Sequence, residues 1–144
     1  MLGAHSDTLT LVHVIWATSN RRPLLVHDFD DWFADFAEAV ARRMKCELLA
    51  VGNSCEHVHV VVRLPPSLAL ADAVRRIKAT SSSSWNARER GNPTLRWQTG
   101  YWARSIDQEG LGPLSAYVRQ QRTRHATSAT LIAWEQPEAS PAIL

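Results

Sequence analysis

The stretch CELLAVGNSCEHVHVVVRL, from Cys46 to Leu64, decides how this chain folds. It contains two runs of strand-forming residues, Cys46–Val51 and His57–Leu64, separated by the turn-forming Gly52-Asn53-Ser54. Two strands this close in sequence are expected to pair as an antiparallel hairpin. Pro65-Pro66 ends the second strand, because proline cannot donate a hydrogen bond to a sheet.

The segments outside this hairpin predict one helix and one strand on each side of it, and a further helix at the end. Apolar residues three and four apart indicate the helices, and β-branched and aromatic residues indicate the strands. The Ser81–Ser84 run forms helix poorly, so it supports the second helix only weakly. The expected elements are a strand Thr8–Thr18, a helix Asp28–Met44, the hairpin, a helix Leu70–Asn86, a strand Tyr101–Ile106 and a helix from Gly112 to about His125.

The order β-α-β-β-α-β plus a C-terminal helix predicts an α+β fold of the ferredoxin-like, split βαβ type. In that fold helices cover one face of an antiparallel sheet. With 144 residues, 45% of them hydrophobic, the chain is long enough for one well-buried core. We expect one domain over residues 1–126 and a C-terminal tail over 127–144.

Nothing in the sequence points to a membrane or to secretion. No apolar run approaches the roughly 20 residues that span a bilayer, and the N-terminus does not resemble a secretory signal. Two cysteines, Cys46 and Cys55, are too few for a disulfide framework. A cytoplasmic protein with reduced thiols is therefore expected.

The charges are distributed unevenly, although the formal net charge is only +2. Five acidic residues and no basic ones lie between Asp28 and Val40. Between Arg75 and Arg124 there are ten basic and three acidic residues, a net charge of +7. Such a basic half can attract a polyanion to one side of the molecule. A merely solvated basic face is the alternative, since charge alone does not distinguish the two.

The strand His57–Leu64 carries two histidines on one face. Successive side chains of a strand point to opposite faces, so His57 and His59 share a face while the intervening valines point away. Two imidazoles at this spacing can converge on a metal ion, although a third donor and open positions are still needed. Two structural histidines are the alternative interpretation.

The last predicted helix places Tyr117 and Gln121 four residues apart, on one face. With an ordinary pKa of about 10, tyrosine is a slow nucleophile unless cations or a metal stabilise its phenolate. Arg119, Arg122 and Arg124 supply cations nearby. An ordinary amphipathic helix with Tyr117 at the edge of the core would give the same pattern.

Together these segments resemble the single-tyrosine transposases of the HUH nuclease superfamily, the IS200-like transposases of small insertion sequences. The resemblance runs from about Leu11 to His125. Its motifs appear in the same order and spacing. They are VHVIWAT (Val12–Thr18) with Arg21-Arg22-Pro23, EHVHVVV (Glu56–Val62), IKATSS (Ile77–Ser82), WQTGYW (Trp97–Trp102) and YVRQQRTRH (Tyr117–His125).

The resemblance implies a DNA transposase that cleaves and rejoins single-stranded DNA with hairpin ends through a 5′-phosphotyrosine intermediate. Tyr117, on the catalytic C-terminal helix, would be the nucleophile. His57, His59 and Gln121 would hold Mg²⁺ or Mn²⁺. The resemblance also implies a homodimer. Candidate DNA-binding residues are Lys78, Arg21, Arg22, Arg104, Arg119 and Arg122.

Two other functions fit the same residues. One is a domesticated, repeat-associated protein that binds or processes DNA and is no longer mobile. The other is a non-catalytic metal-binding domain in which His57 and His59 are structural and Tyr117 belongs to the core.

Overall fold

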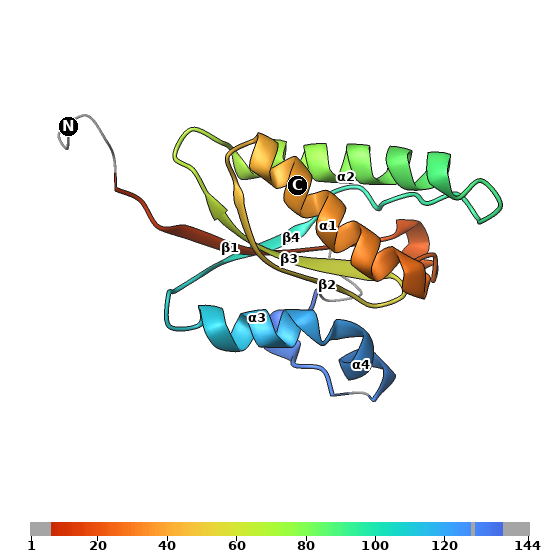
Figure 1. Cartoon of the computed structure of the whole chain (residues 1–144). Helices are drawn as coiled ribbons and strands as arrows, with labels where there is room; N and C mark the ends of the chain where they lie inside the picture. The colour runs from red at the N-terminus through yellow and green to blue at the C-terminus, as the bar shows by residue number, and fades with distance from the viewer. Residues whose placement is uncertain (1–6, 128, 137–144) are drawn as a thin grey trace.

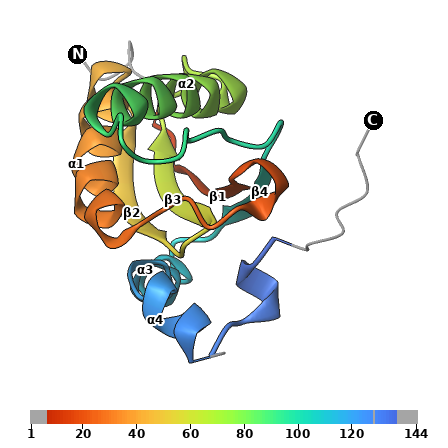
Figure 2. The same cartoon turned by 90° about the vertical axis from the view of Figure 1, so that its right-hand side faces the viewer.

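The structure of the chain, a computed structural model, describes residues 7–127 and 129–136. A four-stranded sheet in the order β2-β3-β1-β4 forms its centre, and every pair of neighbouring strands is antiparallel. Helices α1 and α2 cover one face of the sheet, and α3 and α4 lie on the other (Figures 1 and 2). The predicted α+β, split βαβ arrangement is therefore confirmed.

Most elements begin and end within two residues of their expected positions. Their order is β1 (Thr10–Ala17), η2 (Ser19–Arg21), α1 (His27–Arg43), β2 (Glu47–Asn53), β3 (His57–Leu64), α2 (Leu70–Arg88), β4 (Trp102–Ile106), α3 (Leu111–Arg119), α4 (Gln121–Ala126) and η3 (Ile132–Trp134). Among the described residues, no helix combines the length and apolar character needed to cross a membrane.

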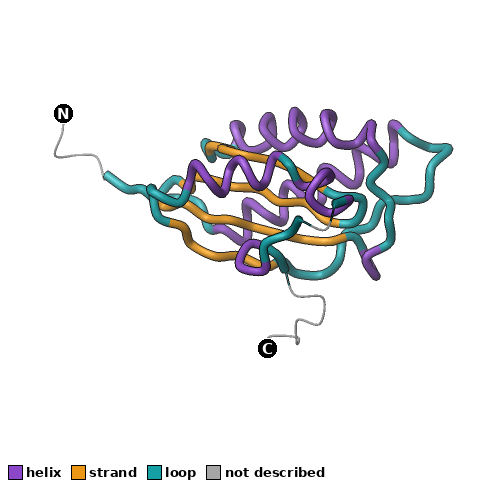
Figure 3. Tube along the Cα trace, turned by 90° about the horizontal axis from the view of Figure 1, so that it is seen from below, coloured by secondary structure: helices purple, strands orange, loops and turns teal. Residues whose placement is uncertain are grey.

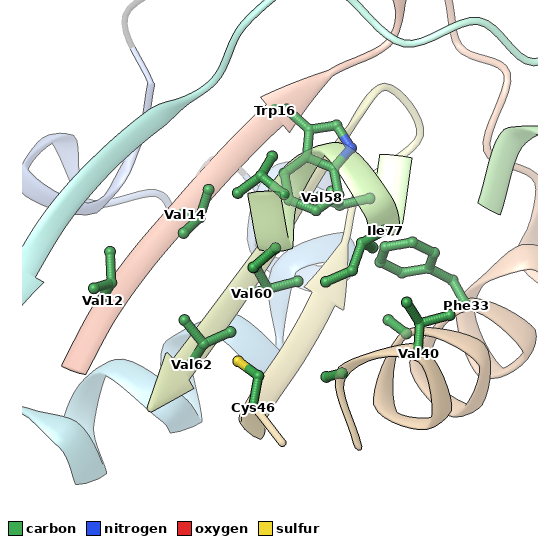
Figure 4. Packing of buried hydrophobic residues seen from close by; sticks show 14 of the residues in the cluster. Val12, Val14, Trp16, Phe33, Val40, Cys46, Val58, Val60, Val62 and Ile77 are labelled. Carbon is green, nitrogen blue, oxygen red and sulfur yellow. The ribbon is translucent and has the colours of Figure 1, made fainter. Parts of the chain in front are cut away.

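The main core lies between the sheet and the α1–α2 layer. Alternate residues of the two central strands point into it, because strand side chains alternate between faces. Fully burying one such side chain contributes roughly 1.5–3 kcal/mol. Figure 4 shows Val12, Val14 and Trp16 of β1 and Val58, Val60 and Val62 of β3 in contact with this layer, which contributes Phe33, Val40 and Ile77.

The same alternation sends His57 and His59 to the opposite face of β3, toward α3. Figure 3 shows the molecule from below, with α3 crossing in front of the strands on this face. A second, smaller core attaches α3 to the sheet there; its buried members are Ala50, Val61, Leu114 and Val118.

Helix α2 continues without a break through Ser81–Ser84, the run that its sequence supports only weakly. The burial of Ser81 and its bond from Trp97 offset the low helix propensity. The Ser81 hydroxyl donates to the Lys78 carbonyl at 3.1 Å and accepts from Trp97 Nε1 at 3.1 Å. The Ser82 hydroxyl also donates to the Lys78 carbonyl, at 3.1 Å. The serines thus bond within the helix, and one of them anchors a neighbouring loop.

The C-terminal helix differs from the prediction of one element reaching His125. It ends at Arg119, and a second helix, α4, starts at Gln121 after Gln120 leaves helical geometry (φ −104°, ψ 17°). The bend coincides with an anchor outside the helix. Arg122 binds Asp30 of α1 with two bonds, at 2.7 and 2.8 Å, and so links α4 to α1.

Candidate active site

The two histidines of β3 are almost fully buried, His57 2% and His59 0% exposed, and both face α3. His57 Nδ1 lies 2.6 Å from Glu56 Oε1 and 2.8 Å from Ser54 Oγ. A carboxylate can only accept, so the Nδ1–H of His57 donates to Glu56. His57 Nε2 is thereby directed away from the strand, toward α4. This is the arrangement in which metal-ligating histidines are usually held.

His59 is held in the same way by a third histidine, His13 of β1. His13 Nε2 and His59 Nδ1 share a hydrogen bond of 2.9 Å, and the two rings stack with centroids 5.1 Å apart. Burial lowers the pKa of His59 to about 4 and that of His13 to about 3. Both rings are therefore neutral at pH 7, the form in which an imidazole nitrogen can bind a metal.

Helices α3 and α4 bring the other two predicted residues to the same place. Tyr117 and Gln121 are each 1% exposed. Gln121 Oε1 lies 3.2 Å from His57 Nε2, and the Tyr117 ring lies edge-on to His59 with centroids 6.3 Å apart. The four residues predicted to be catalytic or metal-binding therefore meet on one face of the sheet.

Two residues that the sequence interpretation did not assign to the site also lie in it. His125 Nε2 is 3.0 Å from Gln121 Oε1, and the His125 ring contacts that of His57 at 4.5 Å between centroids. The sequence signal for His125 was its position at the end of the Tyr117–His125 motif. Glu135 comes from the segment after α4, where the sequence has no recognisable pattern. Its Oε1 lies 3.2 Å from His59 Nε2 and 3.3 Å from His57 Nε2.

Glu135 also contacts the candidate nucleophile. The Tyr117 hydroxyl donates a hydrogen bond to Glu135 Oε2 and accepts one of 2.9 Å from the Leu131 amide. Burial and the bond to the Glu135 carboxylate raise the pKa of Tyr117 above its ordinary value. Burial alone would raise the pKa of Glu135 too, but bonds from His125, His57 and His59 hold it far below its ordinary range. In the metal-free protein the phenol is therefore neutral and the carboxylate charged.

His57 carries the balancing positive charge. Burial alone would lower its pKa, but its bonds to Glu135 and Glu56 prevail and raise it to about 9. In the metal-free protein, the proton on His57 supplies the positive charge between the carboxylates of Glu56 and Glu135 that a bound cation would otherwise supply.

The donor set fits a divalent cation. Ligand atoms of His57, His59, His125 and Glu135 all lie within 4.8 Å of one another, and the Gln121 amide oxygen lies among them. Imidazole nitrogens with carboxylate and amide oxygens suit first-row divalent metals, Mn²⁺ included. The cluster can therefore hold a metal ion beside Tyr117.

Most of the predicted DNA-binding cations already have partners within the chain. Arg21 pairs with Glu56 at 2.9 Å, and Arg119 NH2 donates to the Leu49 carbonyl at 2.9 Å. Lys78 Nζ donates to the carbonyls of the loop before β4, those of Gln98 (2.6 Å) and Gly100 (2.8 Å), and Arg122 pairs with Asp30.

Three of these arginines, Arg22, Arg104 and Arg119, are exposed. The Arg104 guanidinium lies over the Trp102 ring at 4.6 Å from its centroid. Arg104 also donates to the carbonyl of its neighbour Ala103 at 2.8 Å. The charges of Arg22 and Arg104 are nevertheless exposed to a partner in solution.

A cleft of about 600 Å³ lies between α2 and the loop before β4. Cations and aromatic rings line it together, the combination that grooves for single-stranded nucleic acid use. Gln98 of this loop bonds Gln136, the neighbour of Glu135, at 3.5 Å, so the loop touches the segment that reaches the histidines. The lining includes Arg75, Lys78, Arg96, Trp97 and Tyr101.

Comparison with known proteins identifies similar chains. A family model described as "Transposase IS200 like" matches residues 7–121. The ISDra2 transposase TnpA of Deinococcus radiodurans is 21% identical over 120 residues, which are 78% of this chain and 84% of that protein.

Two solved structures share the fold. A candidate transposase from Deinococcus radiodurans superposes with a TM-score of 0.64 at 20% identity, over 81% of this chain and 94% of that one. A REP-associated tyrosine transposase bound to a REP hairpin superposes with a TM-score of 0.61 at 17% identity, over 91% and 74%.

Proposed function

The chain belongs to the family of IS200-like transposases, and on that premise we propose that it cleaves and rejoins single-stranded DNA, with Tyr117 as the nucleophile. The observation that carries this proposal is the meeting of Tyr117 with His57, His59 and Gln121 on one face of the sheet. If Tyr117 were an ordinary residue at the edge of the core, nothing would favour several buried polar side chains beside its hydroxyl, because burying polar groups costs free energy.

In the proposed reaction, the Tyr117 oxygen attacks a backbone phosphorus atom. A bond forms between phosphorus and the phenol oxygen, and the bond from phosphorus to the 3′ oxygen breaks. The proton lost by the phenol is balanced by the proton gained by the leaving oxygen, so the products are a 5′-phosphotyrosine and a free 3′-hydroxyl. The covalent link conserves the energy of the phosphodiester, so a 3′-hydroxyl can reverse the step without ATP.

His57, His59 and Gln121 are the proposed holders of Mg²⁺ or Mn²⁺. When bound, such an ion polarises the phosphate oxygens and offsets the charge that develops on them. The neutral His59 and the directed Nε2 of His57 keep two nitrogen donors aimed at one point. Burial keeps water away from these groups, which strengthens their electrostatic effect on the phosphate.

The proposed substrate is single-stranded DNA with hairpin ends. The cleft between α2 and the loop before β4 offers cations and two aromatic rings, and each stacked base is worth about 1–3 kcal/mol in such grooves. The predicted contacts Lys78, Arg21, Arg22, Arg104, Arg119 and Arg122 remain proposals. Of these we expect the exposed Arg22 and Arg104 to contribute most.

A homodimer is also part of the proposal, on the basis of the family resemblance. Tyr117 lies beside His59 of its own chain. Catalysis in cis is therefore proposed for this arrangement of the helix, whether or not two chains associate.

The test is covalent capture of labelled single strands carrying a hairpin, with and without divalent metal, on a denaturing protein gel. The chain has two tyrosines, Tyr101 and Tyr117, so Tyr101→Phe, which removes a hydroxyl but keeps the ring that lines the cleft, is a matched control for Tyr117→Phe. We expect a metal-dependent adduct with the wild type and with Tyr101→Phe, and none with Tyr117→Phe. An adduct that persists in Tyr117→Phe would refute the proposed nucleophile. The absence of any adduct would favour a metal-binding domain without catalysis.

A further inference from the structure

Glu135 lies beyond residue 121, where the match to the family model ends, yet its carboxylate reaches the centre of the histidine cluster. We propose that Glu135 and His125 ligate the metal together with His57, His59 and Gln121, so that three imidazoles and one carboxylate join the amide oxygen in the site. This proposal rests on the metal site of the proposed function and adds two ligands that lie beyond residue 121, where the match to the family model ends.

The distances support shared coordination. Glu135 Oε1 lies 3.2 Å from His59 Nε2 and 3.3 Å from the Nε2 atoms of both His57 and His125. Neighbouring ligands of an octahedral ion with bonds of about 2.1 Å lie about 3.0 Å apart. The three nitrogens therefore already surround one carboxylate oxygen at nearly the spacing that a common ion imposes.

The segment that carries Glu135 is held against the site by contacts that involve no ionic group of the cluster. The Trp134 ring packs edge-on against Tyr117 at 5.2 Å between centroids, and the Leu131 amide donates to the Tyr117 hydroxyl. On the other side, Arg21 NH2 donates to the Gln136 carbonyl at 3.4 Å. Contacts on both sides of Glu135 thus fix its approach to the histidines.

The same carboxylate joins the metal site to the nucleophile. Its Oε1 faces the three imidazoles, while its Oε2 accepts the hydrogen bond from the Tyr117 hydroxyl. As a ligand, Glu135 therefore also acts as a positioning residue that holds the phenol beside the ion.

The donor set also determines which ion is preferred. Mg²⁺ favours oxygen ligands and retains several waters, whereas imidazoles favour transition metals. Three nitrogens in the coordination sphere therefore select Mn²⁺ over Mg²⁺, and the full-length protein should bind Mn²⁺ more tightly.

The experiment measures Mn²⁺ binding to the full-length, metal-free protein from the electron paramagnetic resonance signal of the free ion. Loss of an outer-shell partner of a metal site costs about 10–100-fold in affinity, so Glu135→Gln, which loses a direct charged ligand, should weaken binding by at least about tenfold. Glu89→Gln is the matched control, because Glu89 is a half-buried carboxylate at the end of α2. Spin-echo spectra of bound Mn²⁺ should show three imidazole nitrogens in the wild type and two in His125→Gln.

The outcomes separate this proposal from the proposed function. Wild-type affinity in Glu135→Gln, together with lost binding in His59→Ala, would overturn the role of Glu135 and leave the metal site itself intact. An unchanged nitrogen count in His125→Gln would overturn the role of His125. A wild type that binds no divalent metal would overturn the metal site of the proposed function as well.

Discussion

Gly52 of β2 lies directly beneath the backbone of Val118 of α3: a Cβ atom at Gly52 would come within 1.7 Å of the Val118 carbonyl oxygen. Gly52 is also the partner of His59 in the β2–β3 ladder. The missing side chain therefore lets α3 approach the sheet beside the histidines. Tyr117, the residue before Val118, depends on this approach.

Gly52→Ala is predicted to displace α3 from the sheet. Overpacking of this kind costs about 1–3 kcal/mol of unfolding free energy, and it should abolish most adduct formation because Tyr117 moves with the helix. Gly112→Ala is the control, because Gly112 lies on α3 itself and a Cβ there meets nothing within 4 Å. Urea unfolding and the capture assay measure the two effects. Wild-type stability and capture in Gly52→Ala would show that α3 does not need this close approach.

The ion pair between Arg122 and Asp30 is predicted to stabilise the docking of α4. The two side chains are 23% and 29% exposed and make two short bonds, at 2.7 and 2.8 Å. A double-mutant cycle with Arg122→Gln and Asp30→Asn should give a coupling of about 1 kcal/mol. The exposed pair Arg42–Glu38 is the control and should give at most about 0.5 kcal/mol. Equal couplings for the two pairs would argue against an anchoring role.

The metal-free protein is predicted to be most stable at about pH 6.5, which is the pKa of an unperturbed histidine side chain. The pKa of His57 is raised to about 9, so its contribution to stability is complete below about pH 6.5 and is lost as pH rises through 9. The pKa values of His13 and His59 are lowered to about 3 and about 4, so stability falls as pH drops below about 6.5.

Urea unfolding with a chelator between pH 5 and 9 measures this curve. His57→Gln should flatten its alkaline side and His13→Gln its acidic side. A stability that rises steadily from pH 6.5 to 9 would contradict the assignment for His57.

The salt dependence of DNA binding is predicted to distinguish the arginines that contact DNA from those that bind other residues of the chain. Each phosphate contact contributes about 0.7 to the slope of log K against log salt for a single strand and about 0.9 for a duplex. Arg22→Gln and Arg104→Gln should each lower this slope by about that amount. Arg122→Gln should change it less, because its guanidinium is already bound to Asp30. Fluorescence anisotropy with a labelled hairpin measures the slopes, and unchanged slopes in the first two variants would remove them from the interface.

The alternation of side chains along the strands made much of the fold predictable, together with the shared face of His57 and His59 in the candidate site. The period of a strand is two residues, so the shared face of His57 and His59 follows from their spacing alone. Tyr117 and Gln121 are likewise close because they are one helical turn apart, and they remain close although the helix bends between them. Local periodicity was sufficient in each case.

The remaining features depend on contacts between residues far apart in the sequence. The bend at Gln120 accompanies the ion pair between Arg122 and Asp30, and no local pattern encodes that pair. Glu135 stands in a segment without periodicity, and only the folded chain brings it to His59. The closeness of Gly52 to α3 also appears only after the second core has formed. The boundary predicted between residues 126 and 127 remains a prediction, although Trp134 and Glu135 contact the site.

The most direct test of the central claim is tandem mass spectrometry of the peptide that carries the nucleotide after metal-dependent capture and digestion. If the phenol beside the histidine cluster is the nucleophile, the 5′ phosphate will be found on Tyr117 and the released strand will end in a 3′-hydroxyl. A phosphate on Tyr101, on a serine or on a histidine would contradict the account.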